Sequence, residues 1–208
     1  MEAADLHRAV RHYRDLAPRY DHFTRRINAI RSRTIEALAL APGQTVLDAG
    51  CGTGWCLPRL AERVGRGGLV IGFDPSPEML DIARSRFPEG LGTQVRLIHA
   101  TAQDVTLPAS VDAILFSYTH DVIRSRAALE NLLRQAKPGA RVAATSTKLY
   151  APWLAPANWY LRATHRAYIT NFEGLKAPWS LLATYLDDFE VRTGPMTQHY
   201  VATGRVRL

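Results

Sequence analysis

The segment Val46–Gly54 constrains the fold of this chain more than any other. It reads VLDAGCGTG, an apolar stretch that carries Asp48 and runs into three alternating glycines, Gly50, Gly52 and Gly54. This pattern is typical of a buried strand that turns sharply into a helix. Glycine permits backbone angles that a Cβ would forbid, and it lets a ligand touch the main chain. We expect a helix from about Thr53, whose first N–H groups point at that ligand. The turn therefore predicts a site for a nucleotide-like cofactor.

The spacing of the glycines discriminates between cofactors. The dinucleotide fingerprint is G-x-G-x-x-G, with its third glycine where the helix packs on the strand. Here the spacing is G-x-G-x-G, and Trp55 stands where that third glycine is needed. An indole there would block the close packing and the approach of a pyrophosphate, which argues against a nicotinamide oxidoreductase. Asp48, just ahead of the turn, also disfavours an anionic ligand and suits one that carries an ammonium group.

A second acid, Asp74, ends the apolar run 69–73 and lies 20 residues after Gly54. An acid at that distance, at the end of a second strand, is placed to accept hydrogen bonds from both ribose hydroxyls. The alternative is an ordinary acid at the entry of a helix. Ser76 and Pro77 predict that such a helix starts there, with Met79 on its inner face.

The composition fits one globular domain of 208 residues, with residues 1–40 as an N-terminal helical cap. No apolar stretch reaches 18 residues and the N-terminus is charged, so we expect neither a transmembrane helix nor a secretory signal. The two cysteines, Cys51 and Cys56, form no disulfide or metal framework, and we expect no metal. A cytoplasmic protein is the default expectation.

The net charge of +7 is concentrated at the N-terminus, where residues 1–33 hold eight arginines against four acids. Helices are predicted over 4–17 and 23–40. The basic surface is either a solvated helical face or one attracted to anionic lipid headgroups or nucleic acid. The lipid version would make the protein peripheral to the inner surface of a membrane.

Strands and helices alternate along the rest of the chain. Strands are predicted at 45–49, 68–73, 94–99, 111–117, 140–147, 189–193 and 197–206, and helices near 54–65, 77–87, 124–136 and 178–186. This order favours an α/β fold, a Rossmann-like, doubly wound, mostly parallel seven-stranded sheet with helices on both faces. Ligands would then bind outside the carboxyl ends of the strands.

Residues 148–173 interrupt the alternation with a long, aromatic-rich segment that we expect to be irregular. It is either a packing cover over the sheet edge or a substrate-side insertion that acts as a lid.

The pattern D-x-G-x-G-x-G resembles the first motif of class I methyltransferases that use S-adenosylmethionine (SAM). The resemblance covers residues 40–147 well and 1–39 more loosely, and it extends to Asp112-Ala113 and to Lys137–Arg141. The pattern is most similar to the ubiquinone/menaquinone-biosynthesis and phosphatidylethanolamine methyltransferase groups. Their Tyr…Tyr-Asp element is matched here by Tyr13 and Tyr20-Asp21.

The resemblance implies how SAM would be bound. Asp48 and the backbone of the turn, at Gly50, Cys51, Gly52 and Gly54, hold the methionyl end. Tyr20 is a candidate for its carboxylate, and the Ser117 carbonyl for its ammonium. Asp74 holds the ribose. Four residues are implied around the adenine: Pro75 and Met79 flank it, and Ala102 and Gln103 contribute to its recognition.

The adenine contact departs from the family pattern at one position. Many relatives carry Gly-Asp-Ala where this chain has Ala100-Thr101-Ala102, so Thr101 replaces the acid that reaches the adenine amino group. Recognition is therefore expected to rest on the backbone around Ala102 and on Gln103.

The reaction that the resemblance implies is an in-line displacement at a methyl group. An enzyme mostly needs to align the acceptor and exclude water, which can supply ~7–11 kcal/mol. A general base is needed only for an acceptor that keeps its proton, and adds about 10²–10⁴-fold. His120 is the candidate base, with a capping or packing histidine as the alternative. Tyr13 and Tyr118 are candidates for contacts with the substrate.

Three functional hypotheses follow. The first is a SAM-dependent methyltransferase that acts on a small molecule or a lipid headgroup. The second is a nucleic-acid (tRNA) methyltransferase, favoured by the pI of about 9.8 but lacking an appended RNA-binding module and an Asn-Pro-Pro-Tyr-type motif. The third is a SAM-binding protein without catalysis. The acceptor atom and the oligomeric state stay open.

Overall fold

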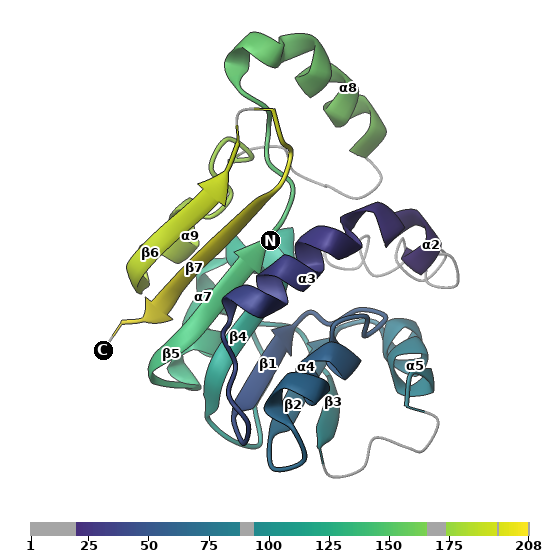
Figure 1. Cartoon of the computed structure of the whole chain (residues 1–208), viewed down its shortest axis with the longest axis vertical. Helices are drawn as coiled ribbons and strands as arrows, with labels where there is room; N and C mark the ends of the chain where they lie inside the picture. The colour runs from purple at the N-terminus through teal and green to yellow at the C-terminus, as the bar shows by residue number, and fades with distance from the viewer. Residues whose placement is uncertain (1–19, 88–93, 166–173, 195, 208) are drawn as a thin grey trace.

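A seven-stranded sheet of order β3-β2-β1-β4-β5-β7-β6 forms the centre of the computed structural model, which describes residues 20–87, 94–165, 174–194 and 196–207 (Figure 1). The strands are β1 (Thr45–Ala49), β2 (Leu69–Asp74), β3 (Val95–His99), β4 (Val111–Ser117), β5 (Ala136–Thr145), β6 (Leu186–Thr193) and β7 (Tyr200–Val206). The first five pair in parallel, whereas β7 runs antiparallel to both β5 and β6. The predicted fold class is confirmed.

Helices cover both faces of the sheet, with α3 and α4 in front and α7 and α9 behind in Figure 1. The helices are α2 (Tyr20–Thr24), η2 (Arg25–Ile27), α3 (Asn28–Ala37), α4 (Leu57–Val64), α5 (Pro77–Ser85), α6 (His120–Ile123), α7 (Arg126–Arg134), η3 (Pro152–Leu154), α8 (Ala155–His165) and α9 (Ser180–Ala183). None of these described helices has the length and apolar character needed to cross a membrane.

Alternation along the strands divides the core into two clusters. In β1, Val46 points to the side of α3 and α4, where it belongs with Leu57 and Leu60 to one buried cluster. Leu47 points the other way and joins the cluster that contains Leu129 of α7. Side chains of period two on a strand that is covered on both faces produce this division. Asp48 consequently lies on the same side of the sheet as α3.

The sheet has its topological switch between β1 and β4. The chain runs from β1 outward to β2 and β3, then returns to β4 on the other side of β1. The connections that leave the carboxyl ends of β1 and β4 therefore diverge and leave a crevice, which is where ligands bind in doubly wound folds.

Several element boundaries differ from the sequence-based expectation. The helix after the glycine turn begins at Leu57, not near Thr53, because residues 50–56 are used by the turn itself. The helix expected over 23–40 is divided by η2 and ends at Ala37, and Ala39 follows in the left-handed region at φ 47°. Strand β5 begins at Ala136, ahead of the predicted position.

The segment after β5 is helical rather than irregular. Residues 152–165 form η3 and α8, which project beyond the carboxyl ends of the strands (Figure 1). Trp153, Trp159 and Tyr160 are exposed, so the idea that this segment is a packing cover over the sheet edge is wrong for these side chains. The predicted helix over 4–17 and the end of the aromatic segment, 166–173, lie outside the described residues.

Candidate functional site

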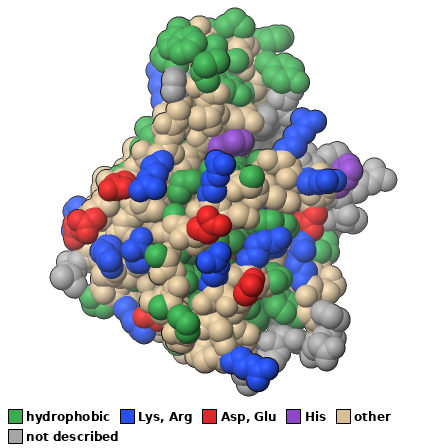
Figure 2. Space-filling model, in the orientation of Figure 1, with side chains coloured by type: hydrophobic (Ala, Val, Ile, Leu, Met, Phe, Trp, Pro, Cys, Tyr) green, Lys and Arg blue, Asp and Glu red, His purple; other side chains and the backbone are tan. Residues whose placement is uncertain are grey.

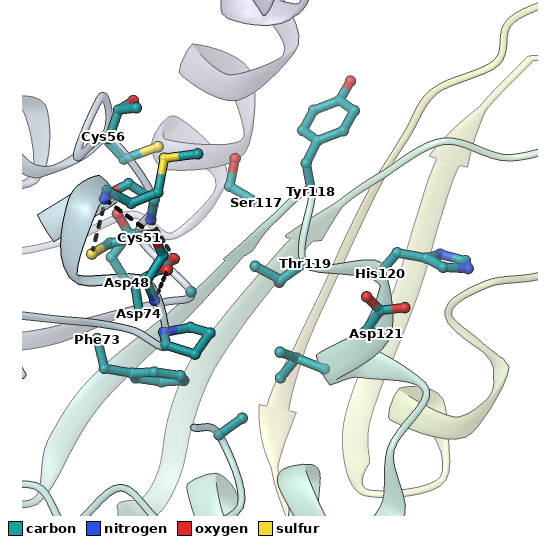
Figure 3. A pocket seen from close by; sticks show the side chains of 18 of the residues that line it. Asp48, Cys51, Cys56, Phe73, Asp74, Ser117, Tyr118, Thr119, His120 and Asp121 are labelled. Carbon is teal, nitrogen blue, oxygen red and sulfur yellow. Dashed lines mark hydrogen bonds between the residues drawn. The ribbon is translucent and has the colours of Figure 1, made fainter. Parts of the chain in front are cut away.

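A pocket opens at the carboxyl ends of β1, β2 and β4, at the switch point of the sheet (Figure 3). It brings together most of the residues that the sequence singled out. Those that line it are Asp48, Gly50, Cys51, Gly52, Asp74, Pro75, Met79, Ala102, Gln103, Ser117, Tyr118 and His120. The residues predicted at the carboxyl ends of the strands thus line one pocket. Tyr13 lies outside the described residues, and Tyr20 begins α2 without a described side chain.

The glycine turn adopts the backbone that the sequence predicted. Gly50, Gly52 and Gly54 have φ values of 68°, 53° and 73°, all in the left-handed region. A Cβ at Gly52 would meet nothing within 4 Å, so its backbone is open to the pocket.

Gly54 does not line this pocket and instead allows close packing of the loop. A Cβ there would lie 2.8 Å from Ala83 Cβ and 2.9 Å from Leu57 Cδ1. Its N–H donates to the Cys51 carbonyl at 2.9 Å, which closes the turn. Gly54 is therefore the point where α4 and α5 approach the loop, and its contact with a cofactor stays a prediction.

Asp48 is a buried carboxylate that lacks a complete set of partners. Its side chain is 1% exposed, and Oδ2 has no hydrogen-bond partner among the described residues. Burial raises the pKa of the Asp48 carboxyl to about 7, although the nearby Arg31 guanidinium opposes that shift. Buried charged groups are normally paired. The carboxylate is thus built to receive a cationic donor from a ligand.

The hydroxyl group of Thr119, beside the pocket, is also buried without a hydrogen-bond partner in the described structure. Ser117 ends β4 opposite the end of β1, so the expected position of its carbonyl near a ligand ammonium is available. Polar groups left unsatisfied in one cavity indicate that a polar ligand completes them.

Arg31 of α3 is a site residue that sequence reasoning missed. It is 5% exposed and lines the pocket, and its guanidinium carbon lies 5.6 Å from the ring centroids of both Trp55 and Tyr118. Its Nη1 donates to Thr24 Oγ1 and Asn28 Oδ1, each at 3.4 Å, whereas Nε has no partner among the described residues.

The position of Arg31 could have been read from helical spacing. Thr34, Ile35 and Leu38, which are three, four and seven residues further on, are all buried. Arg31 therefore shares the inward face of the helix, where an arginine is rarely placed without a partner. A buried cation next to a buried carboxylate is suited to a ligand that carries both an ammonium and a carboxylate group.

Asp74 holds the second acidic position of the pocket. Its Oδ2 accepts from the Gly52 N–H and its Oδ1 from the Ser76 N–H, both at 2.9 Å. Burial raises the pKa of Asp74 to about 6, against the lowering effect of these two hydrogen bonds. Each carboxylate oxygen retains a further lone pair, so Asp74 can still accept from ligand hydroxyls.

The two cysteines of the site are chemically quiet. Cys51 and Cys56 are free and buried. Burial raises the pKa of the Cys51 thiol well above its ordinary value, and nearby Asp48 and Asp74 add to the shift. The thiol stays protonated, and a protonated thiol is a poor nucleophile. Across the described residues no group of three or more His, Cys, Asp or Glu side chains could hold a metal ion.

The far end of the pocket is lined by Pro75, Met79, Ala102 and Gln103, as the resemblance implied for an adenine. Thr101, which replaces the usual acid, donates from Oγ1 to Asp104 Oδ2 at 2.5 Å. An acidic side chain is thus present three residues further along the chain, at Asp104, where it is hydrogen-bonded to Thr101.

The N-terminal cap is tied to the glycine turn through Asp21. Thr53 Oγ1 donates to Asp21 Oδ1 at 2.7 Å, and the Arg86 guanidinium forms an ion pair with the other carboxylate oxygen. Arg86 Nε also donates to the Thr53 carbonyl at 2.6 Å. The turn is held from the cap and from the end of α5 at once.

Tyr118, directly after β4, has a backbone in the left-handed region, at φ 61°. A non-glycine residue in this region is uncommon and is often found at functional sites. Its hydroxyl lies 2.9 Å from Nδ1 of His199, which immediately precedes β7. His199 was not anticipated, because 81 residues separate the two.

His120 begins α6 and is 8% exposed. Its Nε2 lies 3.1 Å from Arg124 Nη1, which can only donate to it. The ring points away from Asp48 and Asp74 in Figure 3. The catalytic role of His120 stays a prediction.

Residues 46–139 match a family described as "Methyltransferase domain". The demethylmenaquinone methyltransferase of Oceanobacillus iheyensis is 33% identical over 119 residues, which are 56% of this chain and 50% of that protein. The chain thus matches half the length of this relative.

A longer match is to the 2-phytyl-1,4-naphtoquinone methyltransferase of Nostoc punctiforme, 30% identical over 195 residues, 85% of this chain and 80% of that protein. The chain belongs to the class I SAM-dependent methyltransferases.

The fold of this methyltransferase agrees with solved structures. The N-methyltransferase NodS of Bradyrhizobium japonicum in complex with S-adenosylhomocysteine (SAH) superposes with a TM-score of 0.57 at 16% identity, over 85% of this chain and 86% of that one. The residues present fit SAM, the cofactor of the family, because Asp48 Oδ2 and Arg31 Nε, both buried and without a hydrogen-bond partner among the described residues, complement the two charges of its amino-acid end.

Proposed function

We propose that this protein transfers the methyl group of SAM to a small molecule with an aromatic, quinone-type ring. The observation that carries the proposal is the buried Asp48 carboxylate at the switch point of the sheet, whose Oδ2 has no hydrogen-bond partner among the described residues. The ring type is supported by two relatives named as methyltransferases of demethylmenaquinone and of 2-phytyl-1,4-naphthoquinone.

In this proposal the pocket residues divide the binding of SAM between them. Asp48 accepts from the ammonium, Arg31 donates to the carboxylate, and Asp74 accepts from the ribose hydroxyls. The first two contacts use atoms that are buried and unpartnered in the described structure. Tyr20 remains a second candidate for the carboxylate. SAM supplies, when bound, a methyl group on a positively charged sulfur.

The acceptor would enter beside Tyr118, on the β4 side of the pocket. The rings of Tyr118 and Trp55 line the pocket near Arg31. The Arg59 guanidinium already stacks on Trp55, 3.6 Å from the ring centroid, so Tyr118 would supply the main apolar surface for an aromatic acceptor and Trp55 would bound the space beside it. Their task is alignment with the methyl group and exclusion of water. Two groups are candidates for accepting a proton from an acceptor hydroxyl, His120 and the Tyr118–His199 pair. The hydrogen bond between Tyr118 and His199 supports the pair, because a proton taken by one can pass to the other.

The chain would act as a peripheral protein where its acceptor is dissolved in lipid. The basic N-terminus, residues 1–33, supplies attraction to anionic headgroups in this scheme. The segment 148–173 would then be the substrate-side insertion.

The test uses purified full-length protein with SAM labelled on its methyl group. Label should appear in a reduced 1,4-naphthoquinone that carries a short prenyl tail, and not in tRNA. Asp48→Asn should abolish incorporation, while Asp112→Asn, at the opposite end of the sheet, should retain it. Label in tRNA alone would replace the proposal with a nucleic-acid methyltransferase. Binding of SAH without incorporation into either acceptor would reduce the protein to a SAM-binding one.

A further inference from the structure

Three large aromatic side chains stand exposed on the segment that follows β5. Trp153 of η3 is 66% exposed, and Trp159 and Tyr160 of α8 are 73% and 67% exposed. We call these three residues the aromatic patch. Figure 2 shows hydrophobic side chains gathered over the tip of the molecule that α8 forms, above a face where charged side chains are spread. An exposed group of large apolar side chains marks an interaction site.

The contacts that attach α8 to the rest of the protein explain why the aromatic patch faces outward. Leu161 packs with Leu149 and Leu175 in a small buried cluster separate from the two main cores. Asn158 fixes the helix in addition, because its Oδ1 accepts from the Tyr150 N–H at 2.8 Å and its Nδ2 donates to the Tyr150 carbonyl at 3.2 Å. Leu161 thus already supplies the apolar contact that attaches α8 to the protein. The tryptophans are available to a partner.

The chemistry of the segment fits a lipid surface. Tryptophan and tyrosine are the residues that favour the interface between lipid headgroups and acyl chains, since each ring has an apolar body and a polar atom. Residues 152–165, which form η3 and α8, contain no Asp or Glu and include Arg162. Anionic headgroups would therefore meet no like charge from these two helices, whose net charge is positive.

The position of the aromatic patch connects it with the pocket. Helix α8 projects from the same end of the sheet at which the pocket opens (Figure 1). We propose that the aromatic patch docks this protein on the surface of an anionic bilayer, with the tryptophans inserted among the headgroups. That the bilayer is also the source of the acceptor rests on the function proposed above. The docking itself requires neither SAM nor acceptor.

The docking test is co-sedimentation of the full-length protein with phosphatidylcholine vesicles that contain phosphatidylglycerol, without SAM or acceptor. The protein should sediment, and its tryptophan emission should shift to shorter wavelength. The double variant Trp153→Ser/Trp159→Ser should reduce the partition coefficient by about tenfold or more for each tryptophan. Both residues are exposed, so unchanged circular dichroism and SAH binding verify that the variant folds.

Two matched variants identify the surface that binds. Trp153→Phe/Trp159→Phe should retain most of the binding, because phenylalanine keeps an apolar ring at each position. Arg8→Ser/Arg11→Ser/Arg14→Ser, in the basic N-terminus, should retain the wavelength shift. Sedimentation that depends on these arginines and not on the tryptophans would overturn the proposal. So would absence of sedimentation, or a dimer of the wild-type protein that the serine variant abolishes.

The outcome is separable from the proposed methyl transfer. A water-soluble, short-tailed acceptor should be methylated equally by the wild type and by Trp153→Ser/Trp159→Ser. An acceptor embedded in vesicles should be methylated more slowly by the variant. If the proposed function fails, both acceptors stay unlabelled while sedimentation persists. If the docking fails, labelling of the soluble acceptor persists and sedimentation is absent.

Discussion

The pairing of a buried carboxylate with a ligand ammonium makes cofactor binding dependent on pH. Asp48 has its pKa raised to about 7 by burial. It is therefore mostly protonated at pH 6 and mostly ionised at pH 7.5. A cationic donor binds the ionised form, so affinity should be present above the raised pKa and be lost as the pH falls through it.

The size of the effect follows from this pKa. About 9% of the Asp48 carboxyls are ionised at pH 6 and about 76% at pH 7.5, which predicts binding of SAH about eightfold weaker at pH 6. Asp74, with its pKa raised to about 6, adds at most a further factor of about two. Binding at pH 6.5 should release about 0.8 of a proton from Asp48, because the bound ammonium holds the carboxylate ionised.

Isothermal titration calorimetry with SAH measures both quantities. The affinity is compared at pH 6 and 7.5, and the proton count comes from titrations at pH 6.5 in buffers of different ionisation enthalpy. Asp48→Asn should weaken binding at pH 7.5 by about 1.5–3 kcal/mol, the value of a hydrogen bond to a charged group. It should also remove most of the proton release.

Asp112→Asn serves as the control for a change of charge. Asp112 opens β4 at the opposite end of the sheet, where it binds the Thr45 N–H at 2.9 Å and Lys137 Nζ at 2.7 Å. This variant should keep the full dependence on pH. Equal affinity at the two pH values, or the same proton release in Asp48→Asn as in the wild type, would refute the pairing of Asp48 with the ammonium.

Three further predictions concern the turn, the cap and the Tyr118–His199 contact. Gly54→Ala should lower the free energy of unfolding by ~1–3 kcal/mol more than Gly52→Ala in urea titrations, because only the former places a Cβ 2.8 Å from Ala83; equal losses would contradict the packing role of Gly54. Asp21→Asn should change stability by less than about 1 kcal/mol, as its ion pair is partly exposed, yet weaken SAH binding through the freed turn, and a variant with unchanged affinity would disprove that link. Tyr118→Phe and His199→Gln should each reduce kcat by ~2–13-fold with unchanged SAH affinity, and the double variant should be no slower than either; strictly additive losses would mean that the two side chains act separately.

The framework of the site could be predicted from sequence because it depends on short-range pattern. Asp48, the three glycines and Asp74 each follow an apolar run, and parallel strands bring such positions to one edge. Ser76 was recognised as a cap, and its Oγ accepts from the Met79 N–H at 3.3 Å. Local chemistry of this kind survives in the folded protein almost unchanged.

What sequence did not yield depends on contacts between distant segments. Arg31 lies near Asp48 only because α3 packs against the sheet. No local sequence pattern at either residue predicts this proximity. The partner of Tyr118, His199, immediately precedes the antiparallel strand β7 near the end of the chain. The length of α8 was missed because Pro152 and Pro156 mimic an irregular segment, although both stand at first turns of helices, where proline is tolerated.

The separate attachment of α8 has an evolutionary consequence. The leucine cluster around Leu161 and the hydrogen bonds between Asn158 and Tyr150 are separate from the two hydrophobic cores on the faces of the sheet. Mutations in this element can accumulate while the domain still folds and retains its cofactor. Descendants of this protein can therefore acquire a different acceptor specificity or subcellular location through changes in α8 alone.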